Sequence, residues 1–471
     1  EFRACDNLQA VYWFYNITGE AFLLDLGNLL HEQSFNFIDM FLNRDHLTRF
    51  NSIHCVNLAQ GLKEPVIYYQ QKPEKSYIDA VKKGLADIRK YNGQPQGMFG
   101  GDEGLHGNNP TQGSELCSAV ELMYSLEKMM EITGDLTFTD HLERIAFNAL
   151  PTQITDDFMN KQYFQQANQI MITRHPHNFY EDAHHAATDI IYGTRTGYPC
   201  CFSNMHQAWP KFTQSLWYAT PDKGIAALAY SPSEVVAQVG DGHEISIIED
   251  TYYPMDDKIR FTIRLSNSVK EVTFPFHLRI PEWCKGAAVT INGITDSING
   301  GSDMAILHRP WKDGDQVILS LPMKVESSRW YENSVAIERG PLVYALKMEE
   351  RWMKKEFVGK ERNQFGFDYY EVSSPTKWNY GILSATIEDL EKNSQVTIDP
   401  DKQSCDYFWN VRNAPIQIKL KAKEMTSWRI YNEMTGPLPF STSKSEQPEE
   451  EIVLVPYGCT TLRISEFPVV R

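Results

Sequence analysis

Two short segments of the sequence carry the side chains most able to do chemistry. Glu115 and Cys117 stand in PTQGSELC, and Cys200 and Cys201 are adjacent in GYPCCFSNMH. Three thiolates and a carboxylate would form a tetrahedral zinc set. Alternatively, Cys117 is a buried helix cysteine and the adjacent pair is an inert or strained vicinal pair. From spacing alone the second interpretation is favoured, because the chain has no CxxC motif and the two segments lie far apart.

Glu115 and Cys117 can face one ion only where the backbone is irregular. Inside a regular helix, side chains two positions apart diverge by about 200°. The sequence places both residues at the start of an amphipathic stretch, 114–133, directly after Gly113. Helical geometry is incomplete at a helix start, so the two side chains can converge there. The helix is expected to end at Gly134, because glycine suits a left-handed C-cap.

The pattern around these segments predicts helices first and strands later. Residues 258–265 alternate between apolar and polar side chains, and Asn292-Gly293 is a hairpin-turn signal. Short strands continue to the C-terminus, which indicates β-sandwiches, with Gly340-Pro341 as a boundary region between two of them. Residues 440–451 are expected to form a solvated loop. Further helices are expected at 6–17, 20–33, 47–62, 76–92 and 138–150, and further strands at 288–291, 314–323, 341–347, 415–421 and 452–464.

Composition and charge narrow the class of protein. A chain of 471 residues is too long for one core, so two or three domains are expected. The net charge of −16 argues against nucleic acid or an anionic membrane surface as a partner. No apolar run is long enough for a membrane span. The eight cysteines are scattered and indicate no disulfide framework. The compartment stays open between cytoplasm and periplasm.

Several ordered segments resemble the β-L-arabinofuranosidases of glycoside hydrolase family 127 and its relatives. The similarity is dense in the helical part and thinner in the strand-rich part. This resemblance reverses the order of the two interpretations above, since it implies a zinc held by one glutamate and three cysteines. The segments are DNLQAVYWFYNITGEAFLLDLGNLLHEQSF, HCVNLAQGLKEPVIYY, GMFGGDEGL, PTQGSELC, ELMYSLEKMMEITGD, HLERIAFNALP, GYPCCFSNMHQAWPKF and ERGPLVYAL.

The resemblance also implies a retaining mechanism with assigned residues. By motif, Glu115, Cys117, Cys200 and Cys201 match the zinc ligands. Cys200, the first of the adjacent pair, matches the nucleophile. Metal coordination removes the proton of a thiol, so such a cysteine could attack an anomeric carbon at neutral pH.

Three further residues match positions of the family outside the metal set. Glu103 in the Gly-rich loop matches the acid/base, although Asp102 beside it is an alternative. His54 and Glu143 resemble positions that contact the sugar. Judged without the resemblance, His54 would be a satisfied core histidine and Glu143 a solvated surface acid.

The fold implied by the resemblance is an (α/α)6 barrel followed by two β-sandwiches. We expect a helical catalytic domain at 1–218, a β-sandwich at 219–335 and a second β-sandwich at 336–471. About six to eight helices can be placed before residue 218, whereas such a barrel needs twelve, so the N-terminal part of the catalytic domain is expected to be missing. An incomplete barrel would expose an apolar face within residues 1–100. The chain would then associate with the missing segment or with copies of itself.

These expectations combine into one predicted function. The protein would be a retaining, zinc-dependent glycoside hydrolase that releases β-L-arabinofuranose from plant glycans. One alternative is a glycosidase of the same fold that acts on another plant-cell-wall sugar, because pocket contacts determine specificity. The other is a non-catalytic carbohydrate-binding protein whose zinc is structural.

Overall fold

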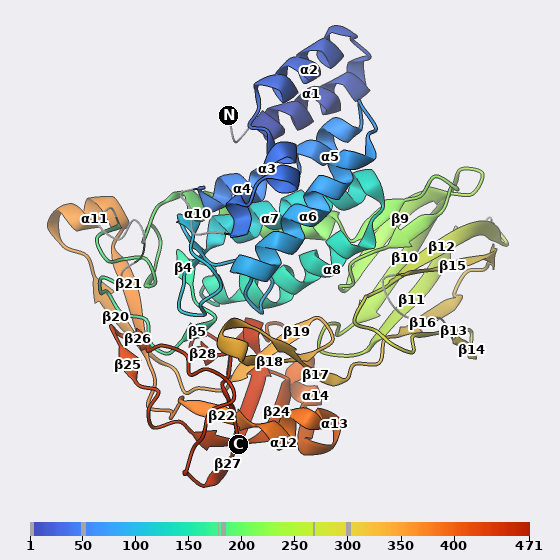
Figure 1. Cartoon of the computed structure of the whole chain (residues 1–471). Coiled ribbons are helices and arrows are strands. Elements are labelled where there is room, and N and C mark those ends of the chain that lie inside the picture. The colour runs from blue at the N-terminus through green and yellow to red at the C-terminus, as the bar shows by residue number, and fades with distance from the viewer. Residues whose placement is uncertain (1–3, 49–52, 178, 180–184, 267–268, 298–302) are drawn as a thin grey trace.

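The computed structural model describes residues 4–48, 53–177, 179, 185–266, 269–297 and 303–471 (Figure 1). Helices dominate the chain up to Gln214, and strands dominate from Trp217 onward. Within the described ranges, no helix is both long and apolar enough to cross a membrane. The α-helices before this change are α1 (Ala4–Thr18), α2 (Phe22–Gln33), α3 (Phe37–Asn43), α4 (Cys55–Gly61), α5 (Glu64–Tyr69), α6 (Lys75–Asn92), α7 (Leu116–Thr133), α8 (Leu136–Arg144) and α10 (Cys200–Gln214).

Helix α7 is the centre of the helical part. It packs against α4, α8 and α10. It ends at Gly134, whose φ of 69° is left-handed and whose N–H bonds to the Met130 carbonyl. The helix and its cap confirm the prediction for 114–133. The predicted apolar stripe of Leu116, Val120, Met123, Leu126 and Met130 is buried, as is most of the rest of the helix.

Most of the other expected helices are present. Residues 6–17, 20–33 and 76–92 correspond to α1, α2 and α6. The stretch 47–62 contains α4, although 49–52 lie outside the described residues. Helices α3, α5 and α10 have no counterpart in the sequence prediction, because α3 and α5 span only two turns or fewer.

Two helices differ from the simple periodic pattern. Residues 138–150 form the end of α8, a π-helical turn at Ile145–Ala149 and the start of a 3₁₀ turn, in place of one regular helix. Helix α10 contains Pro210 in its interior, a residue that argues against a helix in sequence. Its buried face consists of Cys201, Met205, Ala208 and Phe212.

The helix pair α1–α2 lies at one end of the molecule, away from the large sheets (Figure 1). It carries the exposed apolar face that was expected within residues 1–100. Trp13 is 65% exposed, and the face continues over Phe14, Ile17, Phe22 and Leu29.

Two facing sheets form a β-sandwich after the helices. Trp217 of one sheet and Phe261 of the other meet at 5.8 Å between ring centroids, and Phe276 packs edge-on against Phe261. The alternation predicted for 258–265 is confirmed, because every second side chain of β11 is buried. Asn292 and Gly293 form the expected hairpin turn, with φ of 48° and 86°. One sheet contains β7 (Trp217–Ala219), β8 (Ile225–Ala227), β12 (Val272–Ile280) and β15 (Asp303–Trp311), and the other contains β9 (Ser233–Val239), β10 (His243–Thr251), β11 (Lys258–Leu265), β13 (Ala288–Ile291), β14 (Ile294–Ser297) and β16 (Gln316–Ser320).

Eight of the C-terminal strands, which were expected to form a second β-sandwich, belong to one sheet. Val335 and Phe467 exchange two backbone hydrogen bonds of 2.9 Å, which connect the β29 edge back to β18. The sheet therefore curls until its β29 end reaches β18, next to the other edge, and in this way it encloses a core as a sandwich would. Its strands are β17 (Val325–Arg329), β18 (Val335–Arg339), β19 (Leu342–Leu346), β27 (Glu449–Pro456), β24 (Ile416–Glu424), β22 (Tyr380–Leu383) and β29 (Val469–Val470), with β23 (Ser394–Ile398) paired to β24.

The passage between the two strand-rich regions lies earlier than predicted. Strand β17 begins at Val325 and already pairs with β18 of the C-terminal sheet. Gly340-Pro341 is the tight turn between β18 and β19, and Gly340 has φ of 61°. Because β17 pairs with β18, the boundary predicted near residues 335–341 is corrected to the segment between Ser320 and Val325. The sequence could not show this, since a Gly-Pro turn looks the same whether it joins two domains or two paired strands.

Candidate active site and metal centre

A small sheet brings the Gly-rich loop and the start of α7 together. Glu103 forms the turn between its first two strands, with φ of 74°, a strained conformation for a residue with a side chain. The Glu103 carbonyl accepts hydrogen bonds from the Cys55 amide (2.7 Å) and the Cys55 thiol (2.9 Å), which hold the turn in place. Gly101 admits this contact, because a Cβ there would lie 2.8 Å from the Cys55 sulfur. The sheet runs in the order β2 (Gly104–Leu105), β1 (Gly101–Asp102), β3 (Ser114–Glu115) and β4 (Phe164–Gln165).

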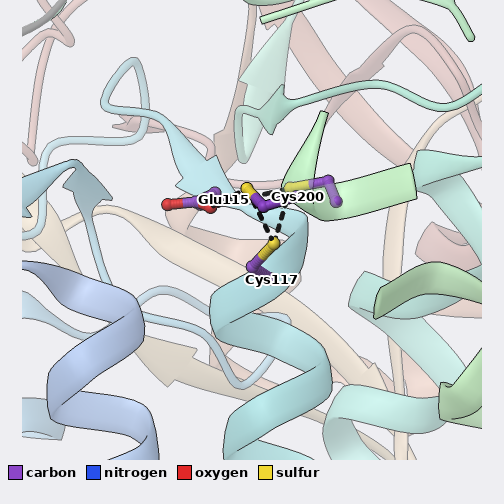
Figure 2. A group of neighbouring side chains, drawn as sticks. Glu115, Cys117 and Cys200 are labelled. Carbon is purple, nitrogen blue, oxygen red and sulfur yellow. Dashed lines mark hydrogen bonds between the residues drawn. The ribbon is translucent and has the colours of Figure 1, made fainter. Parts of the chain in front are cut away.

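Glu115 and the three cysteines of the sequence motifs converge (Figure 2). Glu115 is the extended residue before α7, and Cys117 lies in the first turn of that helix, as their spacing requires. Cys200 and Cys201 begin α10, which packs beside α7. The Cys117 sulfur lies 3.3 Å from that of Cys200 and 3.0 Å from that of Cys201. Oε1 of Glu115 lies 3.7 Å from the Cys200 sulfur and 3.6 Å from the Cys201 sulfur.

The chemistry of this cluster fits a metal ion. The four ligand atoms all lie within 4.8 Å of one another. The three cysteines are free thiols, and Oε2 of Glu115 is buried with no hydrogen-bond partner among the described residues. A buried carboxylate oxygen without a partner is costly unless a cation or a donor satisfies it. Cysteine sulfurs and carboxylate oxygens are both donors that a four-coordinate zinc ion accepts.

Without a cation, the cluster cannot carry several negative charges. Burial raises the pKa of Glu115 and of Cys201 well above their usual values. The pKa of Cys200 is lowered instead, because the Cys117 and Cys201 thiols donate to its sulfur and the ammonium of Lys161 lies nearby. Cys200 is therefore the sulfur that most readily becomes a thiolate. It is also the least buried of the three cysteines in the cluster.

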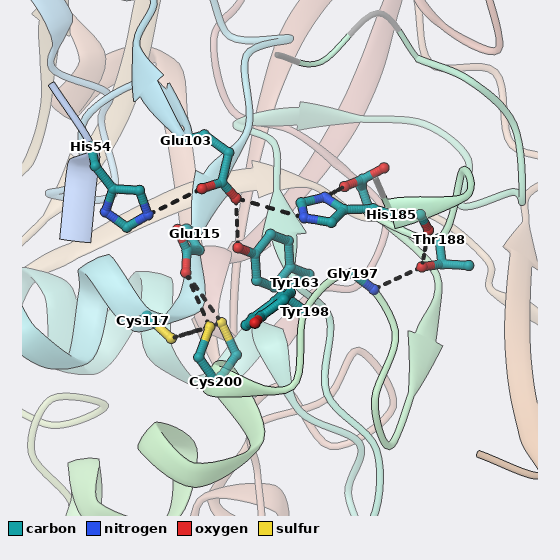
Figure 3. A network of polar contacts seen from close by, with 12 residues as sticks. His54, Glu103, Glu115, Cys117, Tyr163, His185, Thr188, Gly197, Tyr198 and Cys200 are labelled. Atoms are coloured by element: carbon teal, nitrogen blue, oxygen red, sulfur yellow. Dashed lines mark hydrogen bonds and ion pairs between the residues drawn. The ribbon is translucent and has the colours of Figure 1, made fainter. Parts of the chain in front are cut away.

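Glu103 projects from its turn toward this cluster (Figure 3). The hydroxyl of Tyr163 donates to its Oε1 at 2.6 Å, and Nε2 of His54 lies 3.1 Å from its Oε2. The His54 Nδ1 accepts the Asn57 amide at 3.3 Å, so Nε2 carries the hydrogen and donates to Glu103. Burial alone would raise the pKa of Glu103, but the hydrogen bonds from His54 and Tyr163 outweigh burial and lower it.

Sequence reasoning did not find three residues that surround these groups. Tyr163 precedes β4, and the main chain of that strand pairs with β3 beside Glu115. His185 lies 3.9 Å from Glu103 and is oriented by a hydrogen bond to Asp189. Lys161 is fully buried and donates to the backbone carbonyls of residues 196 and 198, just before the cysteine pair. All three depend on tertiary contacts, for which the sequence carries no local signal.

Glu103 shares one cavity of about 750 Å³ with Glu115, Cys117 and Cys200 of the cluster. This size lies within the usual range for a small-molecule site. Most of its lining residues have polar side chains, which suits a ligand with many hydroxyl groups. The lining residues are His54, Val56, Gln60, Glu103, Glu115, Cys117, Glu121, Tyr163, His185, Tyr198, Cys200, Ser203 and Asn204.

Two models of known protein families match this chain. A family model described as the catalytic domain of β-L-arabinofuranosidase GH127 matches residues 3–214. A second, described as the middle domain of the same proteins, matches residues 224–323. The chain belongs to glycoside hydrolase family 127. Together the two matches contain the whole cavity and every strand of the β-sandwich that follows it except β7.

Individual members of family 127 are distant relatives of this chain. A non-reducing end β-L-arabinofuranosidase of Bifidobacterium longum subsp. longum is 26% identical over 249 residues, which cover 51% of this chain and 36% of the relative. The aligned part thus spans about a third of that protein. The match to a solved glycoside hydrolase structure covers 98% of this chain and 74% of the other, with 18% identity and a TM-score of 0.69. The match to a solved GH127 β-L-arabinofuranosidase of Geobacillus stearothermophilus T6 covers 98% of this chain and 72% of the other, with 18% identity and a TM-score of 0.67.

Within the family 127 fold, the acid beside Glu103 faces away from the cavity. Asp102 is fully buried and pairs with His106. Neither residue lines the cavity, whereas Glu103 does. Of these two neighbouring acids, the geometry therefore places only Glu103 at the cavity.

The structure does not bring Glu143 to the cavity, in contrast to the contact with sugar that the motif implied. Its carboxylate is fully buried and lies 2.5 Å from the Arg279 guanidinium, which enters from β12 of the β-sandwich. The Tyr253 hydroxyl also donates to it at 2.8 Å, and the Tyr230 amide at 3.4 Å. These contacts use both carboxylate oxygens, so Glu143 joins the helical part to the sandwich.

Proposed function

We propose that this chain carries the active site of a retaining glycoside hydrolase in which Cys200 is the nucleophile. The observation that carries this proposal is that the Cys200 sulfur takes part in two features of the site. It belongs to the cluster of Glu115, Cys117 and Cys201, and it also lines the cavity that contains Glu103. A nucleophile and an acid/base facing one polar cavity are the minimum set for a retaining glycosidase.

The ion proposed for the cluster is Zn²⁺, held by Glu115, Cys117, Cys200 and Cys201. When bound, it supplies positive charge that keeps the thiols deprotonated and satisfies the free oxygen of Glu115. The buried ammonium of Lys161 adds charge of the same sign and holds the backbone just before the cysteine pair through its two carbonyl contacts.

The residues of the chain then divide the chemistry into two steps. In the first, the Cys200 thiolate forms a bond to the anomeric carbon, while Glu103 gives its proton to the departing glycosidic oxygen. In the second, Glu103 takes a proton from water, and the water oxygen replaces the sulfur at the anomeric carbon. The sulfur leaves as the thiolate, so the free enzyme is restored.

Glu103 needs different protonation states in the two steps. The donors His54 and Tyr163 favour its carboxylate in the free cavity. A sugar that fills the cavity excludes water from Glu103, and such desolvation raises the pKa of a carboxyl group. Binding of substrate therefore favours the acid form required for the first step, and His54 and Tyr163 favour the base form required for the second.

The substrate proposed is a glycan of plant origin that carries terminal β-L-arabinofuranose, cleaved by an (α/α)6-barrel-type helical domain. Family membership supports this choice, because the family description names β-L-arabinofuranosidase. A cavity with few apolar side chains fits a small hydroxylated sugar better than an apolar ligand.

A panel of aryl glycosides with metal analysis tests the proposal. We expect release of the aryl group from the β-L-arabinofuranoside, with about one zinc ion per chain. Cys200→Ser should abolish turnover and retain the fold, whereas Cys405→Ser, at a partly exposed cysteine that does not line the cavity, should retain both. Turnover of a different furanoside or pyranoside would mean that the enzyme acts on that sugar and not on β-L-arabinofuranose. Bound zinc with no turnover on any glycoside would favour a binding protein.

A further inference from the structure

A second cavity, of about 540 Å³, lies where the helical part meets the C-terminal strands. Its walls come from residues 151–160, the start of β20 (Arg351–Glu356), and the loop at 409–412. None of its lining residues lines the catalytic cavity. We propose that it binds neutral sugar units of a longer glycan and anchors a polymeric substrate near the active site. This inference rests on the proposed glycosidase function.

Aromatic faces give the cavity its first sugar-binding feature. Trp352 is 41% exposed, although tryptophan is usually well covered. Its ring is held by Tyr192 and Tyr370, at 5.2 and 6.0 Å between centroids, and its Nε1 donates to Glu350 at 3.2 Å. Trp409 stacks on Phe147 with an interplanar angle of 6°. Rigid, partly exposed rings of this kind offer flat apolar surfaces to the C–H faces of sugar rings.

Carboxylates and amides give the second feature. Both backbone amides of residues 461 and 462 donate to Oε1 of Glu350, at 2.7 and 3.2 Å, and orient the carboxylate. Asp156 accepts from the Asn410 amide at 3.0 Å. Asp157 is held by the Thr155 hydroxyl at 2.6 Å. Sugar hydroxyl groups both donate and accept, so such groups can pair with them while the rings stack.

The charge of the lining excludes several other ligands. Three carboxylates, from Asp156, Asp157 and Glu350, face one guanidinium, from Arg412. This balance disfavours phosphates, nucleic acid and acidic sugars. The polar groups between the rings disfavour a purely apolar ligand. A neutral oligosaccharide satisfies both the rings and the hydrogen-bonding groups.

One short segment connects the two cavities. Asn160 lines the second cavity and Tyr163 lines the catalytic one. Lys161 between them is fixed by its bonds to the carbonyls of residues 196 and 198. Both sites therefore lie on one rigid part of the protein. A glycan held at the second cavity would raise the local concentration of its own terminal sugars at the first.

Calorimetry on the Cys200→Ser chain tests this site separately from hydrolysis. Titration with neutral arabinose-containing oligosaccharides should show one event at each cavity. Trp352→Ala should weaken one event roughly tenfold, the scale of a lost aromatic contact, and leave the other unchanged. Trp352→Phe should keep most of the affinity. Trp13→Ala, at a tryptophan that is 65% exposed on α1, serves as the matched control and should change neither event.

Kinetics on the otherwise unchanged chain completes the test. Trp352→Ala should raise KM for a polymeric glycan that carries terminal β-L-arabinofuranose several-fold and leave turnover of a small aryl β-L-arabinofuranoside as it was. Equal binding by Trp352→Ala and Trp13→Ala would overturn the inference. The titration of the Cys200→Ser chain could instead show no binding at the catalytic cavity but still show the event that Trp352→Ala weakens. That result would count against the proposed function and support this site.

Discussion

The phenol of Tyr163 donates a 2.6 Å hydrogen bond to Glu103, a residue that stands 60 positions earlier in the chain. The bond exists because β4 pairs with β3, which places Tyr163 beside the turn that carries Glu103. It ties the protonation of the proposed acid/base to a side chain that no sequence motif indicated.

Removing this donor should shift the pH dependence of activity. A hydrogen bond to a carboxylate stabilises its charged form, so Tyr163→Phe raises the pKa of Glu103. The alkaline limb of the kcat/KM profile, where the acid form is lost, should then move to higher pH by on the order of one unit. Tyr198→Phe is the control, because Tyr198 lines the same cavity and has no hydrogen bond to Glu103 in the described structure. Identical profiles for the two variants would contradict the assignment.

Metal binding should depend on the cysteines of the cluster and not on others. Cys117→Ser removes one sulfur ligand and should lower the zinc content of the purified chain well below that of the wild type. Cys284→Ser changes a buried cysteine that lies outside the cluster and should keep the metal. Dialysis against a chelator followed by elemental analysis measures both. Equal zinc in the two variants would mean that the ion sits elsewhere.

The interface between the helical part and the β-sandwich should depend on Arg279. Its guanidinium is fully buried between Asp140 and Glu143, with contacts of 2.5 Å to each. Arg279→Met leaves the buried carboxylate of Glu143 and the partly buried carboxylate of Asp140 without their partner and should cost about 3–5 kcal/mol of stability. Thermal unfolding should show a smaller loss when Glu143→Gln is added to the same chain. If the losses of stability caused by Arg279→Met and Glu143→Gln simply add, the ion pair between these two residues would not be the source of the stability.

Glu143→Gln also separates the structural role of this residue from a sugar contact. Because Glu143 does not line the cavity, the variant should keep KM for an aryl glycoside while its melting temperature falls. A KM raised severalfold at unchanged stability would restore the contact implied by the motif.

Glu466 should make stability fall as pH rises from about 4 to about 8. Burial raises its pKa to about 8, and Oε1 has no hydrogen-bond partner among the described residues. The unfolded value is about 4.3, so the stability contributed by the protonated group is lost as pH rises toward and through 8. Glu466→Gln should therefore stabilise the chain at pH 9, by on the order of 1–3 kcal/mol, and have little effect near pH 4. The exposed Glu446→Gln control should show no such trend.

Local sequence signals predicted the parts of the structure that depend on local physics. The apolar period of 114–133, the Gly134 cap and the Asn292-Gly293 turn each depend on a few neighbouring residues, and all three are present. Gly340-Pro341 shows the limit of such signals. A turn between paired strands and a linker between domains use the same residues, so only strand pairing distinguishes them.

The candidate site was predictable to the extent that motifs carried it. Family motifs indicated Glu103 and the four residues of the cluster, and the structure brings these together. The sequence did not indicate Tyr163 and Lys161, because their roles arise from strand pairing and from carbonyl contacts. The structure places Glu143 outside the cavity lining, a position that the sequence could not indicate because a helix face shows only that a carboxylate is present. Its partner, Arg279, comes from a strand far along the chain.

Trapping the covalent intermediate tests the central claim most directly. In Glu103→Gln, an aryl β-L-arabinofuranoside with a good leaving group can still react in the first step, because that group departs without a proton. The second step lacks its base, so the intermediate should accumulate. Peptide mapping by mass spectrometry of the quenched reaction should then find a pentosyl group on the Cys200 sulfur. Turnover with no adduct, or an adduct on another residue, would contradict the account.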